Sequence, residues 1–237
     1  MMVKQCWILP SVSHPEDLAI VSGKAKELQL IGREAKMNSK KLIRSLESNG
    51  YSVTYFERKA SAVDYLNNEI DQKTVGFGDS GTLVEMKLFE ILGEHNSVVD
   101  PQHCGENESF LEVAKKCLAT EVFLTSVNAV SETGELVNID GTGNRIAGSL
   151  FGHKKVYFVI GVNKLTATLE DAIWRAKNIA APLNARRLGI RTPCAHKGNR
   201  CYDCSSPERI CNGLMIYYKK MSNIEVEVIL VDEALGL

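Results

Sequence analysis

Four of the chain's seven cysteines lie close together near its carboxyl-terminal end. They are Cys194, Cys201, Cys204 and Cys211, with the spacing C-x6-C-x2-C-x6-C. Prolines, a glycine and polar residues surround them, which is typical of a loop. A loop can turn several thiolates inward, and thiolates bind soft cations and iron–sulfur clusters. The pattern therefore indicates a metal or iron–sulfur site in a loop over residues 192–212.

The identity of the metal is open between an iron–sulfur cluster and zinc. A zinc ribbon has two C-x2-C knuckles and this loop has one, and the ferredoxin run C-x2-C-x2-C-x3-C-P is absent. A single C-x2-C with wide outer spacers suits either a [4Fe-4S] cluster or a structural zinc. His196 either replaces one cysteine in a zinc site or is a solvated loop histidine.

Two other interpretations of the four cysteines stay open, a redox dithiol and four unrelated residues. A disulfide framework requires an oxidising compartment. The first residues hold few apolar side chains before Pro10, and His14, Glu16 and Asp17 follow, which is a poor signal peptide. No apolar run is long enough to span a membrane. We therefore expect a cytoplasmic protein without a membrane span.

Composition narrows the class of protein. The chain has 237 residues, of which 44% are hydrophobic and 24% charged, with a net charge of -1. These values are ordinary for a globular protein of one large or two small domains. No basic stripe with interleaved aromatic residues occurs, so we expect no nucleic-acid partner.

Strand-like and helix-like segments alternate along the chain, which predicts an α/β fold with a mostly parallel sheet and helices on both faces. The fully apolar run 156–160 is typical of a central parallel strand. The cysteine loop is expected as an insertion before the last two strands. The predicted strands are 51–56, 74–77, 98–99, 121–130, 136–139, 155–161, 213–219 and 225–231. The predicted helices are 15–49, 61–70, 82–92, 107–118, 144–150 and 169–188, the last with a possible break at Pro182.

The first of two glycine-rich loops, residues 76–82, joins a predicted strand to a predicted helix. It contains a literal G-x-G-x-x-G, and Asp100 lies 19 residues beyond Gly81, which weakly resembles a dinucleotide fingerprint. Ligands of open α/β sheets bind beyond the carboxyl ends of the strands. Gly78, Ser80 and Thr82 are therefore candidate ligand-binding residues. The alternative is a tight turn in which Ser80 or Thr82 caps the helix.

The second loop, residues 138–145, also leads from a strand into a helix. A carboxylate, amides and cations that converge at strand ends are the usual profile of a polar ligand site. We expect a small anionic metabolite there, held by Arg145 or Lys164, with Glu132 or Asp140 as acid/base or nucleophile. The alternative is that Asp140 caps the helix and pairs with Arg145 on the surface. The candidate binding residues of this site are Asn128, Asp140, Asn144, Arg145, Asn163 and Lys164.

Four stretches resemble the LUD-domain (lactate utilisation protein) family. They are TSVNAVSETGEL at 125–136, DGTGNR at 140–145, FG at 151–152 and GVNK at 161–164. The resemblance covers roughly residues 38–237. The cysteine-bearing tail from Thr192 to Asn212 looks like the branch of this family found in anaerobic bacteria.

The resemblance implies a fold like that of the sugar-phosphate isomerase and CoA-transferase superfamily. It also implies an association with oxidation of lactate to pyruvate alongside iron–sulfur proteins, but it supplies no catalytic residue. In the family the first glycine loop usually reads Gly-Gly-Ser-x-Thr, and here Asp79 stands where a glycine is expected. Residues 1–36 do not resemble the family. They are expected to form a helical N-terminal extension to a LUD-like domain over residues 37–237.

Three functions are consistent with these observations. The first is an accessory protein or subunit of lactate oxidation with an iron–sulfur cluster in the cysteine loop, which would have iron–sulfur redox proteins as partners. The second is an isomerase- or transferase-type enzyme acting on a small carboxylate or phosphate. The third is a non-catalytic scaffold with structural zinc.

Overall fold

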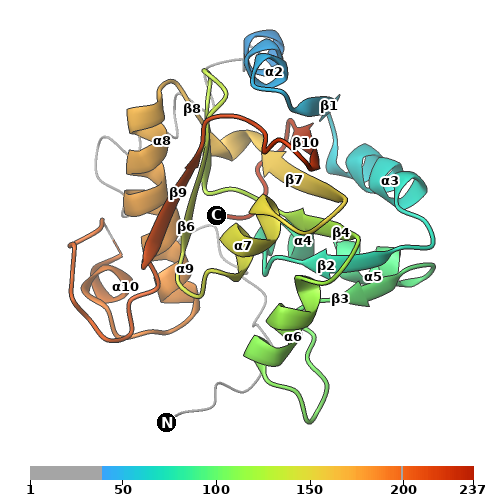
Figure 1. The fold of residues 1–237 in the computed structure, drawn as a ribbon. Helices are drawn as coiled ribbons and strands as arrows, with labels where there is room; N and C mark the ends of the chain where they lie inside the picture. The colour runs from blue at the N-terminus through green and yellow to red at the C-terminus, as the bar shows by residue number, and fades with distance from the viewer. Residues whose placement is uncertain (1–38, 199) are drawn as a thin grey trace.

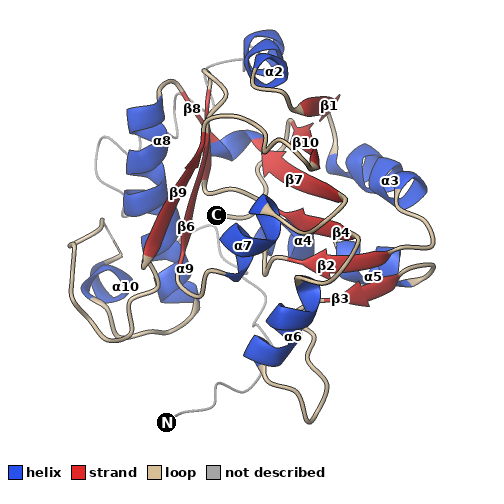
Figure 2. Ribbon diagram, viewed as in Figure 1, coloured by secondary structure: helices blue, strands red, loops and turns tan. Residues whose placement is uncertain are grey.

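The fold is built on a six-stranded sheet in which every neighbouring pair of strands is parallel (Figures 1 and 2). The computed structural model describes residues 39–198 and 200–237. The strand order is β1-β10-β7-β4-β2-β3. The bounds are β1 (Ser52–Phe56), β2 (Thr74–Phe77), β3 (Ser97–Val99), β4 (Val122–Thr125), β7 (Lys155–Gly161) and β10 (Glu225–Val231).

A second, four-stranded sheet has the order β8-β5-β6-β9 and mixes parallel and antiparallel pairs. Its strands are β5 (Ala129–Ser131), β6 (Leu136–Asp140), β8 (Leu165–Thr166) and β9 (Gly213–Tyr217). The sequence patterns did not predict this sheet. The predicted strand 121–130 is in fact two strands, β4 and β5, in different sheets. The crossover is only three residues long, Ser126, Val127 and Asn128, and contains no glycine or proline, so the two short strands look like one in the sequence.

The described helices are α2 (Ser39–Ser48), α3 (Lys59–Glu69), α4 (Gly81–Glu85), α5 (Leu88–Gly93), α6 (Phe110–Cys117), α7 (Asn144–Leu150), α8 (Leu169–Arg175), α9 (Ala181–Arg187) and α10 (Pro193–Lys197). The predicted helix 82–92 is divided between α4 and α5, because Lys87 adopts a left-handed conformation with φ 54°. The predicted extension 1–36, and the predicted helix before Ser39, lie outside the described residues.

The possible break at Pro182 does not occur. The helix continues from α8 through a π-helical segment, Ala176–Ala180, into α9. Proline lacks the N–H that an α-helical interior requires. Pro182 lies in the first turn of α9, directly after the wider π turns, where this loss is tolerated.

Both faces of the parallel sheet are covered, which confirms the α/β class. Strand β7 shows why its sequence is uniformly apolar. Its alternate residues Val156, Phe158 and Ile160 enter one core, while Tyr157 and Val159 enter the other. Helices α3, α4 and α5 cover the second of these cores. The apolar run 156–160 therefore forms a buried parallel strand, as predicted.

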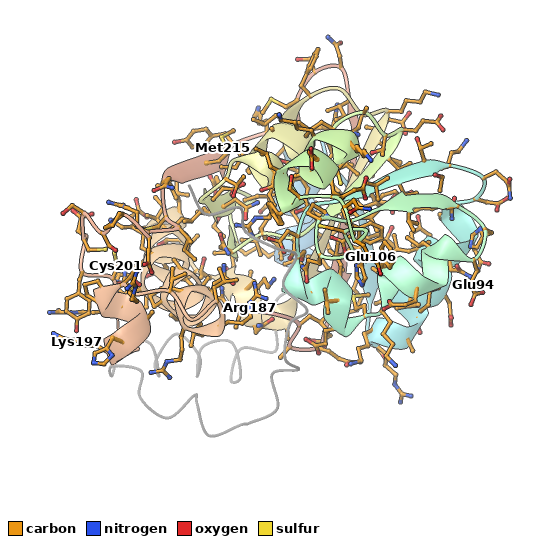
Figure 3. The ribbon with its side chains drawn as sticks, turned by 90° about the horizontal axis from the view of Figure 1, so that it is seen from below. Glu94, Glu106, Arg187, Lys197, Cys201 and Met215 are labelled. Carbon is orange, nitrogen blue, oxygen red and sulfur yellow. The ribbon has the colours of Figure 1, made fainter. Side chains whose placement is uncertain are left out.

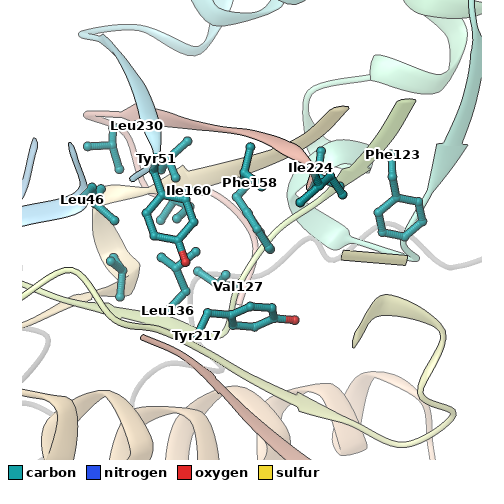
Figure 4. Packing of buried hydrophobic residues seen from close by; sticks show 14 of the residues in the cluster. Leu46, Tyr51, Phe123, Val127, Leu136, Phe158, Ile160, Tyr217, Ile224 and Leu230 are labelled. Atoms are coloured by element: carbon teal, nitrogen blue, oxygen red, sulfur yellow. The ribbon is translucent and has the colours of Figure 1, made fainter. Parts of the chain in front are cut away.

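The core on the other face lies between the two sheets (Figure 4). Leu136 and Tyr217 of the second sheet pack there together with Phe158 and Ile160 of β7. Helix α8 covers the far side of the second sheet, where Ala172 packs among its apolar residues. The second sheet thus lies between the parallel sheet and α8, and its loops approach the strand ends of the parallel sheet.

Candidate functional site

Lys164 forms the centre of the candidate site. It ends a short 3₁₀ turn, Val162–Lys164, directly after β7, and its side chain is only 3% exposed. Its Nζ donates to Thr82 Oγ1 at 2.7 Å and to Ser126 Oγ at 2.9 Å. Thr82 follows β2 and Ser126 follows β4. Because β7, β4 and β2 are parallel neighbours, their carboxyl ends bring these three side chains to one edge of the sheet.

Positive charge dominates the surroundings of Lys164. Burial lowers the pKa of Lys164 well below its usual range, and the charges of Arg175 and Arg145 act in the same direction, against Glu85. Burial also lowers the pKa of Arg175 to about 10. Among the described residues, no carboxylate lies within ion-pair distance of the Lys164 amine. The site therefore favours a negatively charged ligand.

Arg175 holds the two sheets together at this point. Its Nε donates to the carbonyl of Asn163 at 3.0 Å, and its Nη1 donates to the carbonyl of Asn128. Asn163 follows β7 and Asn128 precedes β5. Nothing in the sequence indicated Arg175, because a charged residue in an amphipathic helix is normally expected on the solvent side.

Asp140 caps helix α7. Its Oδ1 accepts from Thr142 N at 3.1 Å, and its Oδ2 accepts from Arg145 N at 3.1 Å and Ile146 N at 3.2 Å. These three N–H groups occupy both carboxylate oxygens, so Asp140 is a poor candidate acid/base. The geometry matches the capping alternative, except that the capping carboxylate is buried and not on the surface.

Arg145 lies beside Asp140, at the start of α7. Its Nη2 donates to the carbonyl of Ile139 at 2.6 Å, and its Nε lies 4.0 Å from Asp140 Oδ2. Its charge acts on both Lys164 and Asp79. The charge of Arg145 therefore reaches Lys164, whereas a shared anion site stays a prediction.

The amide candidates contact backbone. Asn128 Oδ1 accepts from Ile139 N at 2.7 Å. Asn163 Oδ1 accepts from Leu235 N at 3.1 Å, and its Nδ2 donates to the carbonyl of Gly236 at 3.1 Å. Asn128 and Asn163 therefore position strand ends and the carboxyl-terminal segment. Asn144 begins α7 and is half-buried.

Glu132 lies away from the other candidate site residues. It lies in the turn after β5, at the opposite end of that strand from Asn128. Its Oε2 forms an ion pair with Lys41 Nζ of α2 at 2.6 Å. The structure therefore provides no arrangement in which Glu132 and Asp140 act on one ligand.

The first glycine loop differs from a dinucleotide fingerprint in the elements around it. Helix α4, which follows it, has only five residues, and Ser80 at its start makes no side-chain cap bond. A Cβ at Gly78 would lie 2.7 Å from Thr125 Oγ1, so this glycine allows close packing against β4. Asp100 is buried, accepting from Gln102 N at 3.0 Å and lying 3.1 Å from His103 Nδ1. Its carboxylate thus orients its own loop.

Asp79 contributes a carboxylate beside the cations. Its φ of 50° is left-handed, which explains why a glycine is expected at this position. Burial raises the pKa of Asp79 to about 6, although the charges of Arg145 and Arg187 oppose the shift. Arg187 comes from the end of α9 and, like Ser126 and Arg175, was missed in the sequence. The site therefore combines four buried or half-buried basic side chains, Arg145, Lys164, Arg175 and Arg187, with one carboxylate of raised pKa.

The four cysteines follow one another around α10 and the loop after it. All four are half-buried and none is in a disulfide. Arg209 donates to the carbonyls of Cys204 at 2.7 Å and Cys211 at 3.0 Å, which holds the second half of the loop. Within residues 39–198 and 200–237, no three metal-binding side chains converge.

The cysteine loop ends against the loop that carries Arg145. Asn212 donates from its backbone N to the carbonyl of Asp140 at 3.0 Å, and from Nδ2 to the carbonyl of Gly141 at 3.0 Å. Figure 3 shows Cys201 at one end of the molecule and Arg187 nearer its middle. The two candidate sites are therefore separate but share a structural connection through Asn212.

The fold and site define an α/β protein with a cationic cluster at the carboxyl edge of a parallel sheet. The LUD domain family model matches residues 39–231, and the chain belongs to this family. Its structure is similar to a DUF162 family protein from Deinococcus radiodurans, with a TM-score of 0.41 and 13% identity over 87% of this chain and 98% of that one. It is also similar to eIF2B delta from Chaetomium thermophilum, with a TM-score of 0.31 and 16% identity over 56% of this chain and 54% of that one.

The sequence matches no curated protein. None of the described helices is long and apolar enough to cross a bilayer.

Proposed function

We propose that this chain is an accessory protein or subunit of the oxidation of lactate to pyruvate, and that its strand-end site binds the small carboxylate. Membership of the LUD-domain family supports the association with lactate. The proposed setting is the cytoplasm, with iron–sulfur redox proteins as partners.

The observation that carries the proposal is the buried amine of Lys164, which contacts neutral hydroxyls and lies among arginines. The charge that a ligand would balance is that of the arginines, because a guanidinium stays protonated and burying a cation without a counter-charge is costly. A carboxylate ligand would supply negative charge beside Arg145 and Arg175. Arg145 suits the recognition of such a ligand, because a guanidinium can bind a carboxylate through two parallel hydrogen bonds.

For the cysteine loop we propose an iron–sulfur cluster or a zinc ion held by Cys194, Cys201, Cys204 and Cys211. The donor set fits, because four thiols on one loop suit a thiophilic metal or cluster. Among the described residues no three of the thiols converge, so metal binding would rearrange the loop, which is common for small metal-binding segments. The group would supply either electron transfer, if it is a cluster, or structural support, if it is zinc.

Isothermal titration calorimetry tests the carboxylate site. Titrations of the purified chain with pyruvate, lactate and inorganic phosphate should give saturable binding of a monocarboxylate. If none of these anions binds at millimolar concentration, the proposed anion site is wrong. Preference for phosphate would favour the isomerase- or transferase-type enzyme instead.

Metal analysis tests the cysteine loop. Protein purified without oxygen should contain iron and acid-labile sulfide and show the broad visible absorption of a cluster. Zinc without iron would favour the structural scaffold. Neither metal above trace amounts would contradict the metal proposal.

Turnover by the isolated protein separates an accessory protein from an enzyme. Conversion of a 2-hydroxy acid or an acyl-CoA by the purified chain alone would show that it is catalytic. We expect no turnover until a redox partner is added.

A further inference from the structure

The amine of Lys164 makes two hydrogen bonds, so one of the three sites on its nitrogen has no hydrogen-bond partner among the described residues. Ser126 Oγ donates its only hydrogen to the carbonyl of Val159 at 2.6 Å, so it accepts from Lys164. Thr82 Oγ1 has an acceptor in the carbonyl of Leu235 at 3.4 Å, and likewise accepts from Lys164. The amine thus donates two hydrogens. A neutral amine has two N–H bonds and a lone pair, whereas an ammonium has a third N–H.

The surroundings favour the neutral amine. The two hydroxyls that contact it are uncharged, and the charges of Arg145 and Arg175 oppose protonation. No acceptor for a third N–H occurs among the described residues that contact the amine. A desolvated lysine beside other cations is the usual environment of a nucleophilic lysine.

We propose that the amine of Lys164 forms an imine with the carbonyl carbon of a 2-oxo carboxylate whose carboxylate group is bound by Arg145. This inference rests on the proposed carboxylate site and names its ligand class. It assigns Lys164 a covalent role that charge recognition alone does not require.

The step needs no oxidant or reductant. The lone pair of Nζ forms a bond to the carbonyl carbon, and the carbonyl π electrons move to the oxygen, which takes a proton from nitrogen. The resulting hydroxyl group leaves as water together with the second proton of the nitrogen, and the electron pair of the nitrogen completes the C=N bond. Thr82 and Ser126 position the amine by accepting its two hydrogens, so that the lone pair is directed away from both hydroxyls.

Imine formation would make the site select between lactate, the reduced acid, and pyruvate, the oxidised acid. A 2-hydroxy acid has no carbonyl group next to its carboxylate, so it can bind only through charge and hydrogen bonds. A 2-oxo acid can bind through both charge and the covalent bond. The site would therefore retain the oxidised acid in preference to the reduced one.

Reductive trapping tests the proposal. The full chain is incubated at pH 7 with pyruvate and sodium cyanoborohydride, and the modified lysines are located by peptide mass spectrometry. We expect saturable modification of Lys164. Lys154 serves as the internal control, because its side chain is 79% exposed and accessible to the same reagents.

The expected difference is large. A lysine in water, with a pKa near 10.4, is neutral in about one molecule in 2,500 at pH 7. If Lys164 is held as the neutral amine, its modification should be more than about tenfold faster than that of the exposed lysines, with Lys154 as the lysine measured. Lactate in place of pyruvate should give no adduct. Lys164→Arg should remove the saturable modification and leave that of Lys154 unchanged.

Trapping and calorimetry distinguish failure of the imine from failure of the carboxylate site. The trapping experiment locates the adduct in the wild-type protein, so it does not require that a variant folds. Pyruvate binding by calorimetry without any Lys164 adduct would overturn the imine and leave the carboxylate site standing. Modification of Lys164 only after denaturation would also overturn it. Absence of both binding and adduct would overturn both proposals.

Discussion

Lys164 Nζ and Thr82 Oγ1 lie 2.7 Å apart although the two residues are 82 positions apart in the chain. The hydrogen bond joins the segment after β7 to the first turn of α4. It exists only when β2, β4 and β7 are correctly paired, because β4 lies between the other two. The candidate site is therefore a product of the parallel sheet, and its geometry depends on the register of three strands.

Replacing Arg145 should weaken carboxylate binding. We expect Arg145→Ala to cost about 1.5–3 kcal/mol of binding free energy, the scale of a hydrogen bond to a charged group. This corresponds to an increase of roughly 10- to 150-fold in the Kd for pyruvate measured by calorimetry. Arg145→Lys is the matched variant, since it keeps the charge without the paired donors. An unchanged Kd for Arg145→Ala would exclude this residue from the site.

Asp79 should make anion binding depend on pH. Its raised pKa of about 6 means that it becomes negative as the pH rises through 6, close to Arg145 and Arg187. We therefore expect pyruvate to bind more tightly at pH 5 than at pH 7. Asp79→Asn removes the charge and tolerates the left-handed φ, so it should tighten binding at pH 7 and flatten the pH profile. A wild-type profile that rises with pH would contradict this assignment.

The protonation of Asp79 should also affect how the free energy of unfolding depends on pH. The folded-state pKa of Asp79, about 6, lies above the unfolded value of about 3.9. The folded state therefore binds the proton more strongly, and the contribution of Asp79 to stability declines as the pH rises between these values. The Asp79→Asn variant should lack this decline in denaturant unfolding.

The fold class and the edge at which the site lies could be predicted from the sequence. Alternating strands and helices, and the apolar run of β7, depend on local patterns that the sequence shows directly. Lys164 and Thr82 could be proposed because both follow predicted strands. The second sheet was not predicted, because only three residues, Ser126, Val127 and Asn128, separate β4 from β5 and none of them is a glycine or a proline.

The residues that contact the candidate site residues are brought to them by long-range contacts, which local sequence patterns do not reveal. Ser126 looks like any strand-end serine, and only the pairing of β4 with β7 places it beside Lys164. Arg175 looks like a solvent-exposed helical arginine until α8 is packed on the second sheet. Glu132 and Asp140 looked equivalent, but they lie at opposite ends of an antiparallel hairpin.

Removing a single thiol should abolish metal binding by the cysteine loop. We expect Cys201→Ser to lose the metal and to make the segment 192–212 more sensitive to proteolysis, because ligation both needs the thiolate and orders the loop. Metal content and limited proteolysis are the measurements. Cys117→Ala is the control, since Cys117 is buried on α6 and its Sγ contacts the carbonyl of Val99. Full metal content in Cys201→Ser would remove this residue from the ligand set.

The residues before the family-like region are expected to be dispensable for folding. The LUD domain match begins at residue 39, and Met37 could itself serve as an initiator. A truncated protein starting at Met37 should melt within a few degrees of the full chain and keep its metal, as judged by thermal denaturation and metal analysis. Insolubility of the truncated protein, or a large fall in its melting temperature, would make the preceding segment part of the domain.

Glu227 should contribute more to stability than any exposed ion pair of the fold. Its Oε1 accepts from Thr54 Oγ1 at 2.7 Å and Tyr65 Oη at 2.8 Å, and its Oε2 lies 2.8 Å from Lys155 Nζ. Burial alone would raise the pKa of Glu227, but the hydrogen bonds from these three residues outweigh it and lower the pKa.

We therefore expect Glu227→Gln to lower the free energy of unfolding by about 2–3 kcal/mol at pH 7, somewhat less than a fully buried pair because Lys155 is partly exposed. Because the folded pKa lies below the unfolded value, this contribution is present above about pH 4.3 and is lost as the pH falls through the folded pKa.

Glu121→Gln is the matched control. It breaks the exposed pair with Lys154, which should cost at most about 1 kcal/mol. Urea unfolding at pH 7 and pH 3 measures both variants. Equal losses for Glu227→Gln and Glu121→Gln at pH 7 would show that the buried network adds nothing beyond a surface ion pair.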